Sequence, residues 1–259
     1  MSLSLKGKTA LVTGSTSGIG LGIALSLAKQ GADIIMNGFG EYAEAKKQIE
    51  NLGVKVHYHG ADMSKPQEIE ALFADAERQQ TPIDILVNNA GIQYVANIED
   101  FPVERWDAII AINMSSAFHT SRLALPHMKK KNWGRIINIA SAHGLVASAQ
   151  KAAYVAAKHG IVGLTKVTAL ENATSGITCN AICPGWVLTP LVQKQLDDKA
   201  KALGISNEKA TELLLGEKEP SMQFTTPEEI GELAVFLCSK AANNVRGVAW
   251  AMDGGWTAQ

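Results

Sequence analysis

Residues 9–20 read TALVTGSTSGIG, a short apolar run of the strand type that leads directly into a glycine-rich turn. Gly14 suits a tight turn, while Gly18 and Gly20 let the backbone approach a pyrophosphate and let the next helix pack closely on the sheet. The spacing Gly-x-x-x-Gly-x-Gly differs from the usual Gly-x-Gly-x-x-Gly, and ordinary turns can also be rich in glycine. Placed between a strand and a helix, however, the stretch predicts a dinucleotide-binding unit.

The rest of the chain repeats this alternation of short apolar runs and longer segments of helical period. The apolar runs show little polar alternation, which is typical of strands buried on both faces of a parallel sheet. We expect strands within 9–14, 32–38, 54–62, 83–91, 134–141, 176–185 and 247–255. We expect helices over roughly 18–30, 41–52, 66–79, 102–130, 151–174 and 227–239. The pattern predicts an α/β chain with one doubly wound, seven-stranded parallel sheet in a single domain over residues 1–259.

Residues 188–222 interrupt this rhythm, since they contain no strand pattern and read as two amphipathic helices separated around Gly204 and Ser206. The insertion follows the sixth predicted strand, above the carboxyl ends of the strands, where open α/β folds bind ligands. We therefore predict a helical substrate lid. The alternative is a packed insertion that does not move.

The composition excludes several classes of protein. A hydrophobic share of 46% allows a sizeable core, and a formal net charge of -1 gives no sign of a nucleic-acid partner. The three cysteines do not have a metal-site spacing, and their small, odd number fits buried thiols in a reducing compartment. The N-terminus lacks a signal-peptide pattern, and no apolar run reaches the ~18 residues of a membrane span. We expect a cytoplasmic protein without a membrane partner.

The end of the second predicted strand bears on the choice of dinucleotide. NAD-selective folds often place an acidic residue there, whereas this chain has Asn37, Gly38 and Phe39. No Arg or Lys stands there, or in the glycine-rich turn, to neutralise a 2′-phosphate, so the sequence favours NAD over NADP. Phe39 could flank the adenosine or simply pack. Asp62, followed by Met63, could accept a hydrogen bond from the adenine or form an ordinary turn.

Ser141, Tyr154 and Lys158 form the pattern that points to a reaction. Ser141 ends the fifth predicted strand, and Tyr154 and Lys158 are one helical turn apart, so they share a face. A phenol with a pKa of about 10 is a poor base at neutral pH, but a neighbouring ammonium and a positive nicotinamide favour the phenolate. We predict Tyr154 as the general base for alcohol oxidation and general acid for ketone reduction, tuned by Lys158. Ser141 would orient the substrate oxygen.

Together, TGSTSGIG, NNAG at 88–91, Asn113, the Ser141, Tyr154 and Lys158 set and PGW at 184–186 resemble the short-chain dehydrogenase/reductase family over essentially the whole chain. The resemblance implies a Rossmann fold, usually a homotetramer, and hydride transfer between NAD(P) and an alcohol or ketone. It also implies that Lys158 holds the nicotinamide ribose and that Asn113 supports a water-linked proton relay to Lys158. Without the resemblance, Asn113 reads as a helical residue bonded locally.

The resemblance and the glycine-rich turn together give a set of expected cofactor contacts. They come from the turn, the ends of the second to fourth strands, the catalytic helix and the loop after the sixth strand. The residues are Gly14, Ser15, Thr16, Ser17, Gly18, Ile19, Gly20, Phe39, Asp62, Met63, Asn89, Ala90, Gly91, Tyr154, Lys158, Pro184, Gly185, Val187 and Thr189.

Within the family, stretches such as NNAGIQ, INIASAHGLVAS and NAICPGWVLTPLV are similar to the branch that interconverts (R)-3-hydroxybutyrate and acetoacetate with NAD. That substrate carries a carboxylate, for which Lys151, His143, Gln93 and Gln195 offer donors. The bland alternatives are a solvated helix start for Lys151 and a backbone cap for His143. Sequence alone barely separates Gln195 from Gln193.

Trp186 would form a wall of a small-substrate pocket, or else pack against the predicted lid. Two other functions stay open. One is the reduction of another small ketone or a carrier-bound 3-oxoacyl group, which lacks a free carboxylate for Lys151. The other is a cofactor-sensing protein without turnover, which could dispense with Tyr154 and Lys158.

Overall fold

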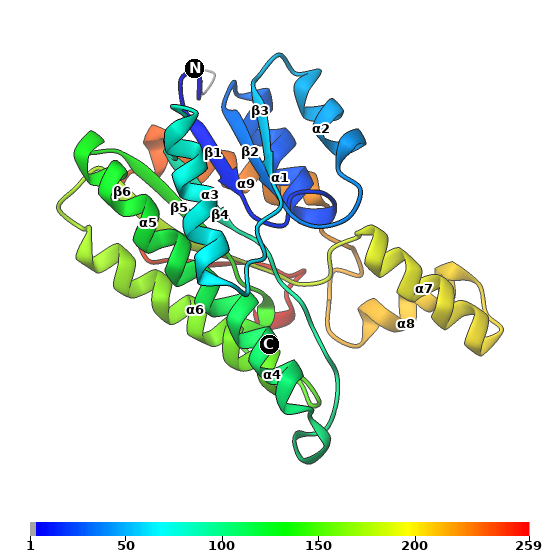
Figure 1. Ribbon diagram of the computed structural model, residues 1–259. Helices are drawn as coiled ribbons and strands as arrows, with labels where there is room; N and C mark the ends of the chain where they lie inside the picture. Colours follow the sequence, from blue (N-terminus) through cyan, green and yellow to red (C-terminus); the bar gives the residue numbers. More distant parts are fainter. Residues whose placement is uncertain (1–3, 259) are drawn as a thin grey trace.

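A parallel sheet forms the centre of the protein, for which the computed structural model describes residues 4–258 (Figure 1). Its seven strands run in the order β3-β2-β1-β4-β5-β6-β7, and every pairing is parallel. They are β1 Thr9–Val12, β2 Asp33–Asn37, β3 Val56–His59, β4 Ile85–Asn88, β5 Gly134–Ile139, β6 Ile177–Pro184 and β7 Ala249–Met252. The predicted doubly wound sheet of seven parallel strands is confirmed, with its topological switch between β1 and β4.

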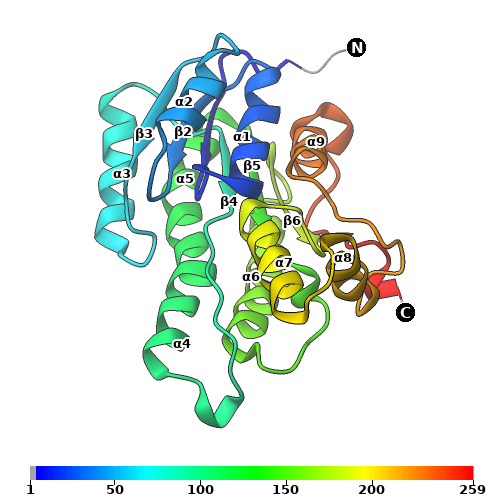
Figure 2. The ribbon, with the colours of Figure 1, turned by 90° about the vertical axis from the view of Figure 1, so that its right-hand side faces the viewer.

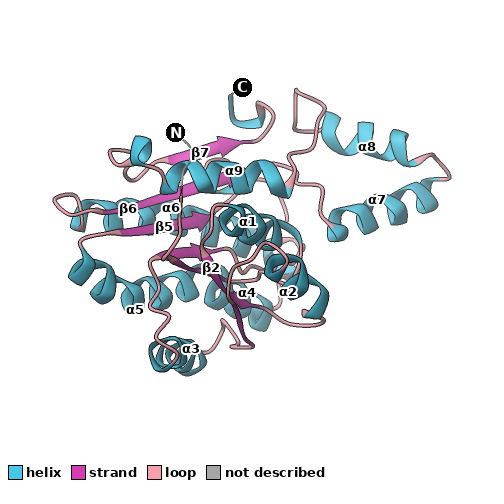
Figure 3. Ribbon diagram, turned by 90° about the horizontal axis from the view of Figure 1, so that it is seen from above, coloured by secondary structure: helices cyan, strands magenta, loops and turns pink. Residues whose placement is uncertain are grey.

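Helices cover both faces of the sheet (Figure 3). One face carries α1 (Gly18–Lys29), α2 (Ala43–Glu50) and α9 (Pro227–Cys238), and the other carries α3 (Pro66–Arg78), α5 (Ser116–Lys131) and α6 (Ala152–Glu171). Successive residues of β1 point to opposite cores: Val12 packs on the α1 side and Leu11 on the α3 side. Both faces are therefore apolar, which is why the strands show no polar alternation.

The predicted helix over 102–130 is interrupted. It consists of α4 (Val103–Ile110), a π-helical turn over Ala111–Ser115 and then α5. A π turn accommodates one extra residue and shifts the faces of the helix on either side of it, which a sequence period of 3.6 cannot reveal. Such turns are frequent at functional sites, and this one contains Asn113.

The two helices predicted within 188–222 are present as α7 (Pro190–Leu203) and α8 (Asn207–Gly216). Gly204 ends α7 with the left-handed φ of +64° that favours glycine, and the Ser206 side chain caps α8 by accepting from Lys209 N. Figures 1 and 3 show this pair extending away from the sheet, and in Figure 2 it faces the viewer. Its small core includes Val192, Leu196 and Ala200 of α7 with Ala210 of α8.

All three cysteines are buried and unpaired, as the sequence predicts. Within residues 4–258, every helix is too short or too polar to serve as a membrane span.

Candidate active site

A cavity of about 440 Å³ lies at the carboxyl ends of the strands and extends from the glycine-rich turn to α7. It brings together segments that are far apart in the sequence. The predicted residues on its wall are Gly14, Ser17, Gly18, Ile19, Gly20, Asn89, Ala90, Gly91, Gln93, Ser141, His143, Lys151, Tyr154, Lys158, Pro184, Gly185, Trp186, Val187, Thr189 and Gln195.

The glycine-rich turn has the geometry that a dinucleotide requires. Gly14 adopts a positive φ of +63°, and Gly20 lies so close to the Gly14 carbonyl that a Cβ there would overlap it. The Asn89 side chain fastens the turn from β4, donating to Thr13 O (2.9 Å) and Gly14 O (3.0 Å). The exposed backbone at the start of α1 therefore fits a pyrophosphate.

Six predicted site residues do not line the cavity: Ser15, Thr16, Phe39, Asp62, Met63 and Asn113. Ser15 is buried and its hydroxyl accepts from Asn37 N (3.2 Å), while Met63 is buried in the core on the α3 side. Their side chains are thus engaged with the protein. Phe39 is 65% exposed, which argues against the alternative that it is a packing residue.

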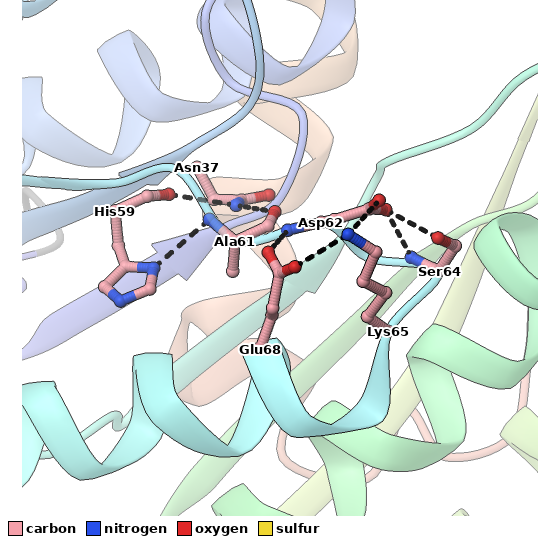
Figure 4. A network of polar contacts seen from close by, with 7 residues as sticks. All are labelled: Asn37, His59, Ala61, Asp62, Ser64, Lys65 and Glu68. Carbon is pink, nitrogen blue, oxygen red and sulfur yellow. Dashed lines mark hydrogen bonds and ion pairs between the residues drawn. The ribbon is translucent and has the colours of Figure 1, made fainter.

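The ends of β2 and β3 are joined by a polar network (Figure 4). The Asn37 amide donates to His59 O (3.0 Å) and Ala61 O (2.9 Å), so it holds the two strand ends together. The Asp62 carboxylate accepts from Ser64 N (2.9 Å) and Ser64 Oγ (2.7 Å), and these hydrogen bonds hold the pKa of Asp62 below its usual range.

The same network contains a lysine that the sequence reasoning missed. Lys65 Nζ lies 2.9 Å from a Glu68 carboxylate oxygen and 3.6 Å from Asp62 (Figure 4). Its positive charge is therefore already shared between two carboxylates at the strand ends.

Tyr154 and Lys158 lie on α6, where Lys158 is buried and Tyr154 is partly buried. Burial raises the pKa of Tyr154, opposed by a hydrogen bond with Ser141, and burial lowers the pKa of Lys158 to about 8. Lys158 Nζ donates to Ile139 O (2.7 Å) and lies 5.5 Å from the centre of the Tyr154 ring. The predicted lowering of the phenol pKa by Lys158 is not seen in the protein alone, where the hydrogen bond with Ser141 is the contribution that opposes burial.

Asn113 binds backbone rather than its own helix. Its Oδ1 accepts from Ile92 N (2.9 Å) and its Nδ2 donates to Ile92 O (2.9 Å). The alternative of a locally bonded helical asparagine is therefore wrong. The π turn directs this side chain onto the segment after NNAG, and so fixes the backbone between Gly91 and Gln93.

His143 is a buried residue on the wall of the cavity. Its Nδ1 is 3.4 Å from Ser141 Oγ and its Nε2 is 3.0 Å from Ser148 Oγ. Burial lowers its pKa to about 4, with smaller contributions from Lys151 and Lys218. At neutral pH the ring can therefore donate or accept hydrogen bonds but carries no charge.

Lys151 is half-buried at the start of α6, with Nζ 5.7 Å from the centre of the Trp186 ring. Burial lowers the pKa of this amine. Among residues 4–258 no carboxylate forms an ion pair with it. A half-buried ammonium without a counter-ion favours an anion in the cavity.

Two further findings concern residues near the substrate end. Gln195 lines the cavity, whereas the Gln193 amide donates to Asp197 (2.9 Å), so the structure separates the two. Trp256, which the sequence reasoning missed, also lines the cavity and packs its ring edge against His143, with ring centres 5.0 Å apart. The stretch DGGWTA at 253–258 is part of the resemblance to the family, but it does not by itself place Trp256 in the cavity.

A family model described as short chain dehydrogenase matches residues 8–200. The chain belongs to the short-chain dehydrogenase family. It is 68% identical over 257 residues to a D-beta-hydroxybutyrate dehydrogenase of Cupriavidus necator, with 98% of this chain and 100% of the relative covered. A Rhizobium meliloti protein of the same name is 56% identical, with 97% and 99% covered.

Solved structures of similar fold agree with this assignment. L-Sorbose reductase from Gluconobacter frateurii, complexed with NADPH and L-sorbose, aligns with a TM-score of 0.95 at 31% identity and 100% coverage of both chains. A putative gluconate dehydrogenase from Agrobacterium tumefaciens aligns at 0.91 and 34% identity, covering 100% and 99%. A short-chain dehydrogenase uses a nicotinamide dinucleotide, which the glycine-rich turn and the cavity fit.

Proposed function

We propose that this chain is an NAD-dependent dehydrogenase that interconverts (R)-3-hydroxybutyrate and acetoacetate. The observation that carries the proposal is the half-buried Lys151, which has no ion-pair partner in the described part of the chain and lies in the same cavity as Ser141, Tyr154 and Lys158. A carboxylate on Lys151 places the rest of a short hydroxy acid beside the hydroxyl groups of Ser141 and Tyr154. The full-length similarity to two D-beta-hydroxybutyrate dehydrogenases supports the same substrate.

Different segments of the chain bind different parts of the cofactor. In this proposal the turn from Gly14 to Gly20 holds the pyrophosphate, the segment 89–91 lies along the dinucleotide, Lys158 binds the nicotinamide ribose, and the loop 184–189 contacts the nicotinamide amide. When bound, the nicotinamide supplies the hydride acceptor for oxidation and the hydride donor for reduction.

Tyr154 is the residue that transfers the proton. During oxidation its oxygen takes the hydroxyl proton of the substrate, and during reduction it returns the proton to the ketone oxygen. Ser141 donates a hydrogen bond to the same substrate oxygen and shares its developing charge. Asn113 holds Ile92 and, as part of the proposal, supports a water-linked path for the proton through Lys158.

The remaining polar groups bind the substrate carboxylate. Lys151 supplies the charge, and His143, Gln93 and Gln195 supply hydrogen bonds without adding charge. The indole rings of Trp186 and Trp256 form apolar walls for the short methyl end.

We propose NAD rather than NADP because, within residues 4–258, the ends of β2 and β3 offer a 2′-phosphate no cation that is free of carboxylate partners. The charge of Lys65 is shared by Glu68 and Asp62, and the Asn37 amide is used by the backbone of β3 (Figure 4). A phosphate dianion placed there would lose water without gaining a full charge partner.

The first test follows NADH formation at 340 nm with each enantiomer of 3-hydroxybutyrate and with NAD or NADP. We expect turnover with the (R) acid and NAD, and a kcat/KM at least about 100-fold lower with NADP, equivalent to about 2.7 kcal/mol. The coenzyme A thioester of the (R) acid is the control for the carrier-bound alternative. Faster turnover of the thioester than of the acid would contradict the proposed substrate, and turnover of neither would favour a different alcohol.

We further propose that α7 and α8 close over the substrate and that the protein is a cytoplasmic homotetramer. Exposed apolar side chains on two surfaces support association: Phe118, Val167 and Leu170 on α5 and α6, and Val248 and Trp250 at the edge strand β7. Two separate patches suit the two kinds of interface in a tetramer. Light scattering should give about four times the 27.6 kDa mass of one chain, and a monomer would contradict the assembly. The buried, unpaired cysteines suit a reducing compartment.

A further inference from the structure

Glu219 is a buried carboxyl that the proposed reaction does not use. It lies in the segment 217–226, which links α8 to α9, and is 1% exposed. Its Oε1 accepts a hydrogen bond from the backbone N–H of Trp186. Its Oε2 is buried without a hydrogen-bond partner in the part of the chain that the structure describes.

The linking segment holds Trp186 by both of its backbone groups. Trp186 N donates to Glu219, and Trp186 O accepts from Thr225 N (3.0 Å). The residue before it, Gly185, leaves the space that the carboxyl occupies, because a Cβ there would overlap Glu219 Oε1. Trp186 in turn lines the cavity and packs against the small core of α7 and α8. Glu219 thus sits behind the wall that carries Trp186.

We propose that Glu219 is a positioning residue for the substrate cavity, which holds the backbone of Trp186 while its carboxyl is protonated and releases it when the carboxyl ionises. The consequence for substrate binding rests on the proposed function. The consequence for stability does not.

The surroundings disfavour the ionised form, although a carboxylate accepts the Trp186 N–H more strongly than a protonated carboxyl does. The negative charge that acts on Glu219 is that of Asp253, whose carboxylate accepts hydrogen bonds from Gly255 and Thr257 on the C-terminal segment. The ammonium groups of Lys151 and Lys218 lie over the Trp186 and Trp256 rings, at 5.7 and 5.8 Å, and neither forms an ion pair with Glu219 within residues 4–258. A buried carboxylate with one unpaired oxygen and no cation is unfavourable, so ionisation drives it toward water.

Burial accordingly raises the pKa of Glu219 to about 7, with the Trp186 hydrogen bond opposing the rise and Asp253 adding to it. A carboxyl whose pKa is higher in the folded state stabilises the fold most at pH values below its unfolded pKa of 4.5. That stabilisation is lost as the pH rises through about 7. Glu219 should therefore hold the backbone of Trp186 less firmly as the pH rises through the neutral range.

The test compares Glu219→Gln, which keeps the shape and the acceptor oxygen but cannot ionise, with the wild type and with Glu217→Gln. Glu217 is an exposed neighbour on the same segment and serves as the matched control. The melting temperature is measured from pH 5 to pH 9 without substrate. Separately, KM and kcat for 3-hydroxybutyrate are measured over pH 6 to 8.5.

As the pH rises from 5 to 8, we expect the melting temperature of Glu219→Gln to increase relative to that of the wild type. The difference in melting temperature between Glu217→Gln and the wild type should stay constant over this range. The wild-type KM should rise roughly tenfold relative to that of Glu219→Gln over the same range, as expected for loss of one well-placed wall, with kcat changing less. Glu219→Ala, which removes the acceptor, should have the raised KM already at pH 6.

A constant difference in melting temperature across pH, or a KM of Glu219→Gln that follows the wild type at every pH, would overturn the proposal. If the wild type does not turn over 3-hydroxybutyrate at all, the proposed function fails, but the melting curves still decide whether Glu219 ionises in the folded protein.

Discussion

Tyr154→Phe should lower kcat for 3-hydroxybutyrate oxidation by about 10²–10⁴-fold, the usual range for loss of a general acid–base group. The variant keeps the ring and its packing against His143, where the ring centres are 5.9 Å apart, but has no oxygen to take the proton. The dissociation constant for NAD, measured by fluorescence titration, should change by less than about twofold, because the other expected cofactor contacts and the ring of residue 154 are kept.

Tyr42→Phe is the matched control, since that ring stacks on Tyr58 with centres 3.6 Å apart, away from the residues that line the cavity. It should retain wild-type turnover. If Tyr154→Phe turned over substrate at a comparable rate, Tyr154 would no longer be the base. If it lost NAD binding as well as turnover, the result would point to damaged folding or cofactor geometry instead.

Lys151→Met should lower kcat/KM for 3-hydroxybutyrate by roughly 10–100-fold, chiefly through KM. The methionine keeps an apolar stem over Trp186 and removes only the charge, so the loss measures the ion pair with the substrate carboxylate. Charge-assisted hydrogen bonds of this kind contribute about 1.5–3 kcal/mol, which sets the expected range.

The informative comparison is with a neutral substrate. Reduction of methyl acetoacetate, which has no free carboxylate, should change by less than about threefold in Lys151→Met. Lys166→Met, at an exposed position of the same helix, should leave both substrates unaffected. An equal loss with the acid and with the ester would show that Lys151 supports the fold of the cavity rather than binding the carboxylate.

Local patterns in the sequence determined the framework of this protein. The apolar runs predicted all seven strands and their parallel arrangement. A strand of a sheet that is covered on both faces has a nearly continuous apolar sequence, which can be recognised without knowing the neighbouring strands. The Gly14 to Gly20 turn and the one-turn spacing of Tyr154 and Lys158 were equally readable, since each depends only on residues close together in the chain. The resemblance to the family then supplied the chemistry.

Tertiary structure alone decided which distant residues meet. Asn113 reaches Ile92 only because a π turn redirects it, and Trp256 joins the cavity only because the chain after β7 returns to His143. Burial, which depends on every surrounding element, raises the pKa of Tyr154, whereas the sequence led us to expect a lowered pKa. Glu219 contacts Trp186 although the whole of α7 and α8 lies between the two residues in the sequence. Sequence patterns record what each residue prefers locally, whereas desolvation and long-range hydrogen bonds depend on the packed fold.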